Sequence, residues 1–169
     1  MSEGVDVGNL PSRDVRAIAI DNRNQVWIGT NKGLRVLPSA SSYNSTDQMR
    51  ANAIIILEDD LAQELLFEQF ITDIAVNGSN EKWIGTADSG VFLFSPNGQE
   101  TIYHFTKDNS PLPSNTINDI AINPETGEVK SGQVDTPAGF SHWLIKFDGV
   151  TDSQFGTSVG YGRVEMAYY

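Results

Sequence analysis

The chain has 169 residues, which is long enough for one domain with a substantial hydrophobic core. Lys and Arg number 11 against 22 Asp and Glu, and the formal net charge of −11 repels nucleic acid and anionic membrane surfaces, so neither is an expected partner. There is no cysteine, which excludes disulfides, thiolate metal sites and cysteine nucleophiles. No apolar run is long enough to span a bilayer, and residues 1–4 lack the basic and apolar regions of a signal peptide.

The first predicted elements are three short strands joined by two tight turns. Val15–Ile20 alternates in character with a period of two, and Val26–Thr30 follows after the turn-forming sequence Asp-Asn-Arg-Asn. A second turn, Asn-Lys-Gly, leads into a strand over Gly33–Leu37. These signals predict an antiparallel meander.

The stretch that follows is less regular. Residues 39–47 are polar and predict a loop, whereas residues 53–57 and 65–70 are apolar and predict two further strands. Between these two runs, residues 58–60 are Glu-Asp-Asp, which lacks the spacing of a calcium-binding loop. We interpret them as a solvated hairpin turn rather than a metal site.

The strand pattern then repeats. Ile71–Val76 and Lys82–Thr86 match the first two strands without a gap, at an offset of 56 residues from Val15 to Ile71. After one inserted residue, residues 90–94 match the third strand of the first copy. Repetition at a fixed interval is the signature of repeat architectures.

A further strand and the start of a third copy follow. Asn97-Gly98 is a hairpin signal and precedes a strand-like stretch at residues 101–106. The third copy opens with Leu-Pro-Ser at residues 112–114 and continues at 117–122, which lies 102 residues after Val15–Ile20. Short strands joined by tight turns at such intervals predict four-stranded β-propeller blades.

Two residue types recur at fixed places in the repeat and have a structural interpretation. A large Trp can fill the wedge between neighbouring sheets, and a Gly allows a close approach of the backbone or a turn. Core packing and turn geometry are therefore favoured over a ligand site for these residues. The positions concerned are Trp27, Gly29, Gly33, Trp83, Gly85 and Gly90.

Over residues 10–129 the repeated pattern of Leu-Pro-Ser, Ile-Ala-Ile, a turn and Val-Trp-Ile-Gly-Thr resembles the two-component regulator propeller repeat. The resemblance implies a bacterial periplasmic or cell-envelope location, as in the sensor regions of hybrid histidine kinases and in type IX secretion components of the PorZ kind. It further implies blades without catalytic residues that bind ligands or pair with other domains, so that the partner is a glycan or a protein. It assigns no ligand-binding residue, because the motif is itself structural.

The end of the chain resembles a different family. Segments within residues 124–169 are similar to part of the N-lobe of HipA-like serine/threonine kinase toxins. That resemblance implies an ATP-phosphate contact by Lys146 and an acidic residue, Glu165, at the start of a helix. The phosphate loop, catalytic Asp and metal ligands of phosphoryl transfer have no counterpart here, so we expect no enzyme and interpret both residues as solvated. The alternatives are a truncated kinase fragment and a composite or designed chain without an evolved function.

Two other patterns raise catalytic or metal-binding hypotheses. Residues 156–160 match the G-x-S-x-G pattern of the nucleophile elbow, but no apolar strand precedes them and both histidines, His104 and His142, lie upstream. A loop is the favoured interpretation, because the triad order of that family needs its His after the Ser. Two isolated histidines do not make a zinc site either.

We therefore predict a mainly β fold of antiparallel propeller-type blades that do not close, with a short C-terminal helix. Residues 1–129 are expected to form about two and a half blades, and residues 130–169 a β-hairpin, which pairs about 128–134 with 142–147, followed by the helix. No cofactor and no metal are expected. Open blade edges are expected to favour self-association, which increases with salt as the charge repulsion is screened.

Overall fold

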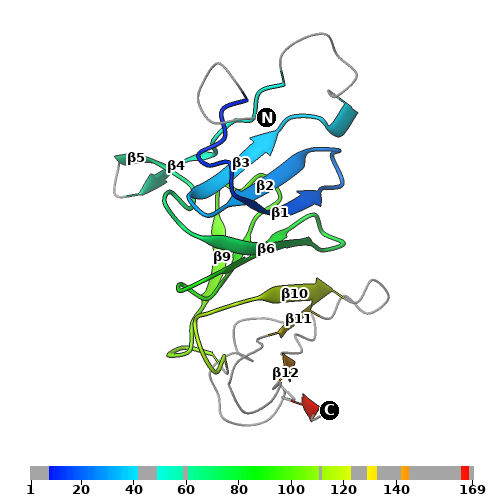
Figure 1. Cartoon of the computed structure of the whole chain (residues 1–169), viewed down its shortest axis with the longest axis vertical. Helices are drawn as coiled ribbons and strands as arrows, with labels where there is room; N and C mark the ends of the chain where they lie inside the picture. The colour runs from blue at the N-terminus through cyan, green and yellow to red at the C-terminus, as the bar shows by residue number, and fades with distance from the viewer. Residues whose placement is uncertain are drawn as a thin grey trace.

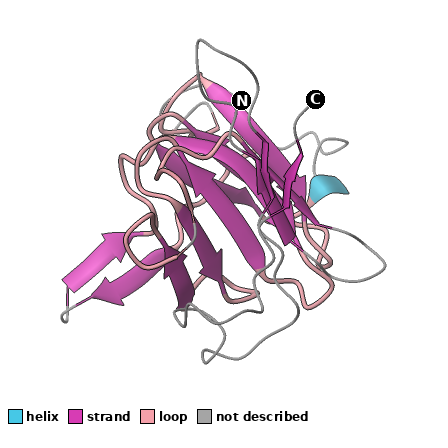
Figure 2. Ribbon diagram, turned by 90° about the horizontal axis from the view of Figure 1, so that it is seen from below, coloured by secondary structure: helices cyan, strands magenta, loops and turns pink. Residues whose placement is uncertain are grey.

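The computed structural model describes residues 8–41, 49–58, 61–110 and 112–122, and three short strands further along the chain. Its strands are β1 (Val15–Ile20), β2 (Val26–Thr30), β3 (Gly33–Leu37), β4 (Ile55–Glu58), β5 (Leu61–Glu64), β6 (Ile71–Val76), β7 (Lys82–Thr86), β8 (Val91–Phe94), β9 (Thr101–Phe105), β10 (Asp119–Ile122), β11 (Val129–Gly132), β12 (His142–Leu144) and β13 (Glu165–Ala167). Figure 2 shows that strands dominate and that the described helical structure is one short turn, at residues 40–41. No described helix has the length and apolar character needed to cross a membrane.

Two antiparallel sheets repeat the same design. The first blade is the three-stranded sheet β1-β2-β3, and the second blade is the four-stranded sheet β6-β7-β8-β9. In the first blade Ala19 pairs with Trp27, and in the second Ala75 pairs with Trp83, so the two tryptophans have the same register. The first strand of each blade, β1 and β6, also has a register shift near its start. We call these first strands the inner strands. The predicted fold class of antiparallel, unclosed propeller-type blades is therefore confirmed.

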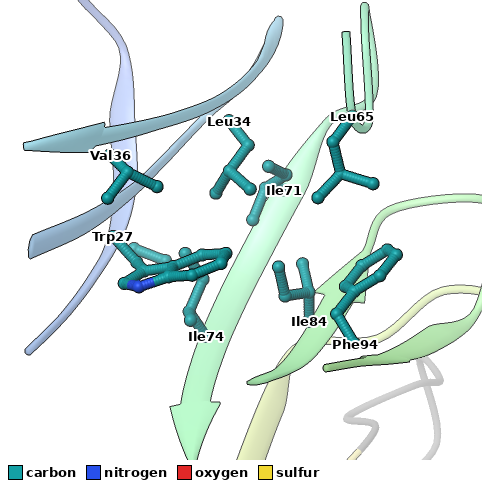
Figure 3. Packing of buried hydrophobic residues seen from close by; sticks show 9 residues of the cluster. Trp27, Leu34, Val36, Leu65, Ile71, Ile74, Ile84 and Phe94 are labelled. Atoms are coloured by element: carbon teal, nitrogen blue, oxygen red, sulfur yellow. The ribbon is translucent and has the colours of Figure 1, made fainter. Parts of the chain in front are cut away.

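The blades stack through their innermost strands. β1, β6 and β10 lie side by side along the long axis of the molecule in Figure 1. The core between the first and second blades is built from the aliphatic and aromatic side chains of both, as Figure 3 shows. Its buried members are Ala17, Trp27, Leu34, Val36, Leu65, Ile71, Ile74, Ile84 and Phe94. A second cluster around Trp83 and Ile117 joins the second blade to the start of the third repeat.

The array is open at the first blade. Because side chains alternate along a strand, Ile18 and Ile20 of β1 point away from the core that contains Ala17. They remain 64% and 60% exposed, respectively. The described part of the chain thus leaves one blade face without a neighbouring blade against it.

The first blade lacks a regular fourth strand. An isolated bridge between Val36 and Asn52 stands where the second blade has β9, and the chain then enters the β4–β5 hairpin. From Val15 to Ile71 the repeat interval is 56 residues, against 46 from Ile71 to Ile117. Part of this additional length lies between Val36 and Asn52, which are 16 residues apart against 10 for the equivalent pair Leu93 and Tyr103. The rest lies in the β4–β5 hairpin, which projects away from the stacked sheets in Figures 1 and 2.

The strand predicted at residues 65–70 is wrong. The strand that pairs with β4 is β5 (Leu61–Glu64), and Leu66 and Glu68 have φ angles of 54° and 57°, which are incompatible with a strand. Hydrogen bonds from Phe67 N to Glu64 O and from Gln69 N to Leu66 O fold this stretch into turns. Its apolar character is explained by Leu65, which is buried in the core between the blades.

The C-terminal prediction needs two corrections. The segment that begins at Glu165 is a strand, β13, rather than a helix, because it pairs antiparallel with β12. β11 pairs with β10 instead of with β12, which differs from the hairpin expected between residues 128–134 and 142–147. Beyond residue 122 the structure describes β11, β12 and β13. The division of the chain into residues 1–129 and 130–169 therefore stays a prediction.

Candidate functional site

The repeated tryptophans lie at the two junctions of the stacked blades. Trp27 is buried between the first and second blades, and its Nε1 donates to Asp21 Oδ2 at 3.2 Å. Trp83 is buried between the second blade and β10, where its ring stacks on Phe105 with centroids 5.7 Å apart. Each indole therefore fills the wedge that opens between neighbouring sheets.

The glycine that follows each Trp-Ile pair receives a side chain of the next blade. A Cβ on Gly29 would lie 2.5 Å from Cγ2 of Ile71, and one on Gly85 would lie 2.8 Å from Cγ2 of Ile117. Ile71 begins β6, and Ile117, at the same repeat position, lies two residues before β10. The Trp-Ile-Gly pattern is thus a stacking device that places the next inner strand.

Gly33 and Gly90 have a different role. Gly33 begins β3 and Gly90 immediately precedes β8, and their φ angles are positive, at 126° and 84°. Residues with a Cβ rarely adopt this conformation. The amide of Gly90 also donates to Asn115 O at 2.8 Å, which fastens the turn to the segment that leads into β10.

A buried ion pair crosses the first junction. Lys82 Nζ lies 2.9 Å from Asp21 Oδ2, and neither side chain is exposed to solvent. The ammonium also donates to the carbonyl oxygens of Asn80 at 2.7 Å and Pro96 at 2.8 Å, and lies 4.6 Å from the ring centre of Trp27. All three protons of the ammonium have acceptors, which is the condition for burying such a charge.

The carboxylate of Asp21 is equally well satisfied. Burial by itself raises its pKa, but hydrogen bonds from Gln25 N, Lys82 Nζ, Arg23 N and Trp27 Nε1 outweigh burial and lower the pKa to about 2. Burial also lowers the pKa of Lys82, against the opposing effect of Asp21. Asp21 accordingly remains ionised in the folded protein at neutral pH.

This pair could not be assigned from the repeat. Val26 and Asn77 stand at the positions of Lys82 and Asp21 in the other blade, so the pair is specific to the first junction. The only signal in the sequence is that Lys82 precedes Trp83 in KWIGT, whereas the first blade has Val26 before Trp27 in VWIGT.

Two carboxylates face each other at the second junction. Asp73 of β6 and Asp119 of β10 occupy the repeat position of Ala17, and Asp73 Oδ2 accepts from Ile120 N at 2.7 Å. Burial raises the pKa of Asp73; amide donations from Ile120 and Ile74 oppose the rise, and the charge and hydrogen bond of Asp119 add to it. The inner strands thus bring together an acid pair that the sequence analysis did not identify.

The acid pair should make stability at this junction depend on pH. Because the native pKa of Asp73 lies above its ordinary value of 3.8, the unfolded chain loses its proton first, and stability falls as pH rises through this window. Replacing Asp119 by Asn removes the repulsion, so we expect a gain of about 1 kcal/mol or less, since Asp119 is exposed. Urea unfolding at pH 4 and pH 7 should show a larger gain at pH 7. An equal gain at both values would contradict the contribution of Asp119 to the raised pKa of Asp73.

Among the remaining candidate residues, His104 is the one whose side chain the structure describes. The His104 ring stacks on Phe92 with centroids 3.9 Å apart, and its Nε2 lies 2.6 Å from Ser89 O. The side chains of His142 and Glu165 are not described, and Lys146 and residues 156–160 lie outside the described residues. Within the described ranges, no three His, Asp or Glu side chains gather in a way that could hold a metal ion.

Comparison with protein families and solved structures agrees with this stacking. The family model described as "Two component regulator propeller" matches residues 9–32. PorZ, a bacterial surface component of the type-IX secretion system of Porphyromonas gingivalis, has a similar structure with a TM-score of 0.66. It shares 30% sequence identity over 69% of this chain, which covers 16% of PorZ.

Two extracellular domains from B. thetaiotaomicron show the same fold. One, assigned to a hybrid two component system, has a TM-score of 0.58 at 24% identity, and the match covers 83% of this chain and 16% of that one. The other, assigned to a one component system, has a TM-score of 0.60 at 18% identity, with 82% and 18% covered. The chain thus spans less than a fifth of each of these three structures. No curated protein matches the sequence.

Proposed function

We propose that the chain is a non-enzymatic binding or sensing segment of a β-propeller in a bacterial envelope sensor or secretion protein. The observation that carries this proposal is the use of the repeated residues. Trp27, Gly29, Trp83 and Gly85 are all occupied in stacking one blade on the next, which is a scaffold role. Recognition then falls to the loops and insertions by which the blades differ, as is usual for repeat scaffolds.

The similar proteins support the location and the class. PorZ is a surface component, and the two domains from B. thetaiotaomicron are extracellular. A periplasmic or cell-envelope location and a glycan or protein partner follow for this chain by analogy. The net charge of −11 disfavours polyanions such as nucleic acid among the ligands.

A thermal-shift screen tests the proposal. We expect a neutral or basic oligosaccharide, or a protein partner, to raise the unfolding temperature, because a ligand that binds only the folded state stabilises it. Mg-ATP should leave the unfolding temperature unchanged, because the chain's negative field opposes the triphosphate and no phosphate loop accompanies Lys146.

The Lys146→Ala variant decides between this proposal and the kinase alternative. Its stability and its response to Mg-ATP should equal those of the wild type, since a solvated Lys contributes about 0–1 kcal/mol. Micromolar binding of Mg-ATP to the wild type that disappears in Lys146→Ala would overturn the binding-module proposal in favour of a kinase fragment.

A further inference from the structure

The β4–β5 hairpin presents aliphatic side chains to solvent although it is the part of the first blade that has no counterpart in the second. Ile55, Leu57 and Leu61 are 49%, 78% and 66% exposed, respectively. Exposure of three large aliphatics on one short projecting element is unusual for a surface without a partner. A two-stranded hairpin alone is also only marginally stable, so a third strand would stabilise it.

The free edge of β4 carries two of these residues, Ile55 and Leu57. Leu65 N donates to Ile54 O at 2.8 Å, so these two residues form a hydrogen-bonded pair of the antiparallel ladder. Because bonded and non-bonded pairs alternate, the main-chain groups of Ile55 and Leu57 point outward, away from β5. Within the described residues, no main-chain hydrogen bond from outside the hairpin reaches either of them.

The base of the hairpin is held firmly in place. Arg35 of β3 is largely buried, and its Nη1 lies 3.0 Å from Glu64 Oε2 of β5. Leu65 is buried in the core between the blades, and Ile54 and Ile56 pack against that core. The outer edge therefore projects from an anchored base and is presented in one orientation, which lowers the entropy that a binding partner must lose.

Charge indicates the chemistry of the partner. Residues 51–70, which include the hairpin, contain five acidic residues and no Lys or Arg, and of these five Glu64 is paired with Arg35. A second copy of this chain would bring the same acidic hairpin and a further net charge of −11, so pairing of two copies at this edge is opposed unless salt screens the charges. A basic segment is attracted by the same field and is the complementary occupant.

We propose that the outer edge of β4 is a docking site for a basic, strand-forming segment of a partner protein. The segment adds as a third strand beside Ile55 and Leu57, with main-chain hydrogen bonds to their outward groups and aliphatic contacts on the exposed face. This inference rests on the proposed function as a binding module and names the partner of its inserted element.

A labelled peptide of alternating Lys and Val tests the docking site by fluorescence anisotropy. We expect the wild type to bind it, and binding to weaken with salt as the charges are screened. Leu57→Lys should weaken binding roughly tenfold or more, because it removes the most exposed aliphatic and places a charge on the edge. Ile18→Lys is the matched control, since it makes the same change of charge at an exposed aliphatic of β1 and should bind like the wild type.

Two altered peptides separate the contributions. Replacement of Lys by Glu should abolish binding if charge selects the partner, and N-methylation of alternate amides should abolish it if strand pairing does. The proposal is overturned if the original peptide fails to bind, if the N-methylated peptide binds as well, or if Ile18→Lys weakens binding as much as Leu57→Lys. Sedimentation of the free protein adds a further test: a dimer lost in Leu57→Lys but not in Ile18→Lys would assign the edge to a second copy and also overturn it.

The same variants distinguish this inference from the proposed function. If an oligosaccharide stabilises both the wild type and Leu57→Lys while the peptide fails to bind, only the docking site is wrong. If the peptide binds at the hairpin and no oligosaccharide stabilises the protein, the docking site stands and the glycan is excluded as the ligand of the module.

Discussion

Replacing Lys82 by Met should lower the free energy of unfolding by about 3–5 kcal/mol, because it leaves the carboxylate of Asp21 buried without its counter-ion. The methionine side chain is of similar length and apolar, so the loss reports the charge rather than a cavity. The carbonyl oxygens of Asn80 and Pro96 would also lose the ammonium as a donor. Urea unfolding monitored by circular dichroism measures the change.

A double-mutant cycle with Asp21→Asn supplies the control. Asn keeps the shape of the carboxyl but removes its charge, so Asp21→Asn alone should also destabilise, by leaving the Lys82 ammonium uncompensated. The Asp21→Asn/Lys82→Met protein should be more stable than the sum of the single changes implies, with a coupling energy of about 1–3 kcal/mol. Additive effects would mean that the two charges are solvated and do not form the buried pair.

The pair also predicts how the first junction responds to acid. Because hydrogen bonds hold the native pKa of Asp21 at about 2, below its ordinary value of 3.8, its stabilising contribution is fully present above that ordinary value. It is lost as pH falls from about 4 toward 2, where the folded protein must also take up the proton. The Asp73–Asp119 pair changes stability in the opposite direction. Acid therefore destabilises the first junction, whereas at the second junction it protonates Asp73 and removes the repulsion between the two carboxylates.

The strands of both blades could be predicted from the sequence because local signals agree with one another. In Val15–Ile20 and Ile71–Val76 the period of two, the β-branched residues and the turns rich in Asn, Asp and Gly all indicate the same inner strand. The stretch at residues 65–70 misled because apolar character alone does not distinguish a strand from a core-facing turn. Leu65 is apolar because it enters the core between the blades, and Leu66 turns the chain with a positive φ.

The junction residues could not be predicted, because their roles depend on a neighbouring blade. Asp21 lies in a sequence typical of turns and does cap that turn, accepting from Arg23 N and Gln25 N at 2.9 Å each. Only the position of Lys82, 61 residues later, shows that the other carboxylate oxygen serves the next blade. The alternation along β7 equally fails to reveal that the Lys82 side chain is fully buried.

Gly90→Ala should be the most damaging single substitution among the turn glycines and should lower the free energy of unfolding by about 2–4 kcal/mol. A side chain at a φ of 84° is strained, and its Cβ would overlap the carbonyl oxygen of Phe105 on β9. Backbone atoms of a paired strand cannot move aside without breaking the ladder between β8 and β9. Thermal and urea unfolding measure the loss, and Gly78→Ala is the control, since nothing lies within 4 Å of a Cβ there.

Gly33→Ala separates the two contributions to that loss. Gly33 occupies the same place at the start of β3, also with a positive φ, but the first blade has no regular fourth strand beside it. Its Cβ would lie 3.1 Å from Leu66 O, in a turn that can shift by a few tenths of an ångström. We therefore expect Gly33→Ala to cost only the conformational part, about 1–2 kcal/mol. If both alanine variants lose the same stability, the overlap with β9 contributes nothing, and the fourth strand of the second blade is held less rigidly than its pairing with Val91 implies.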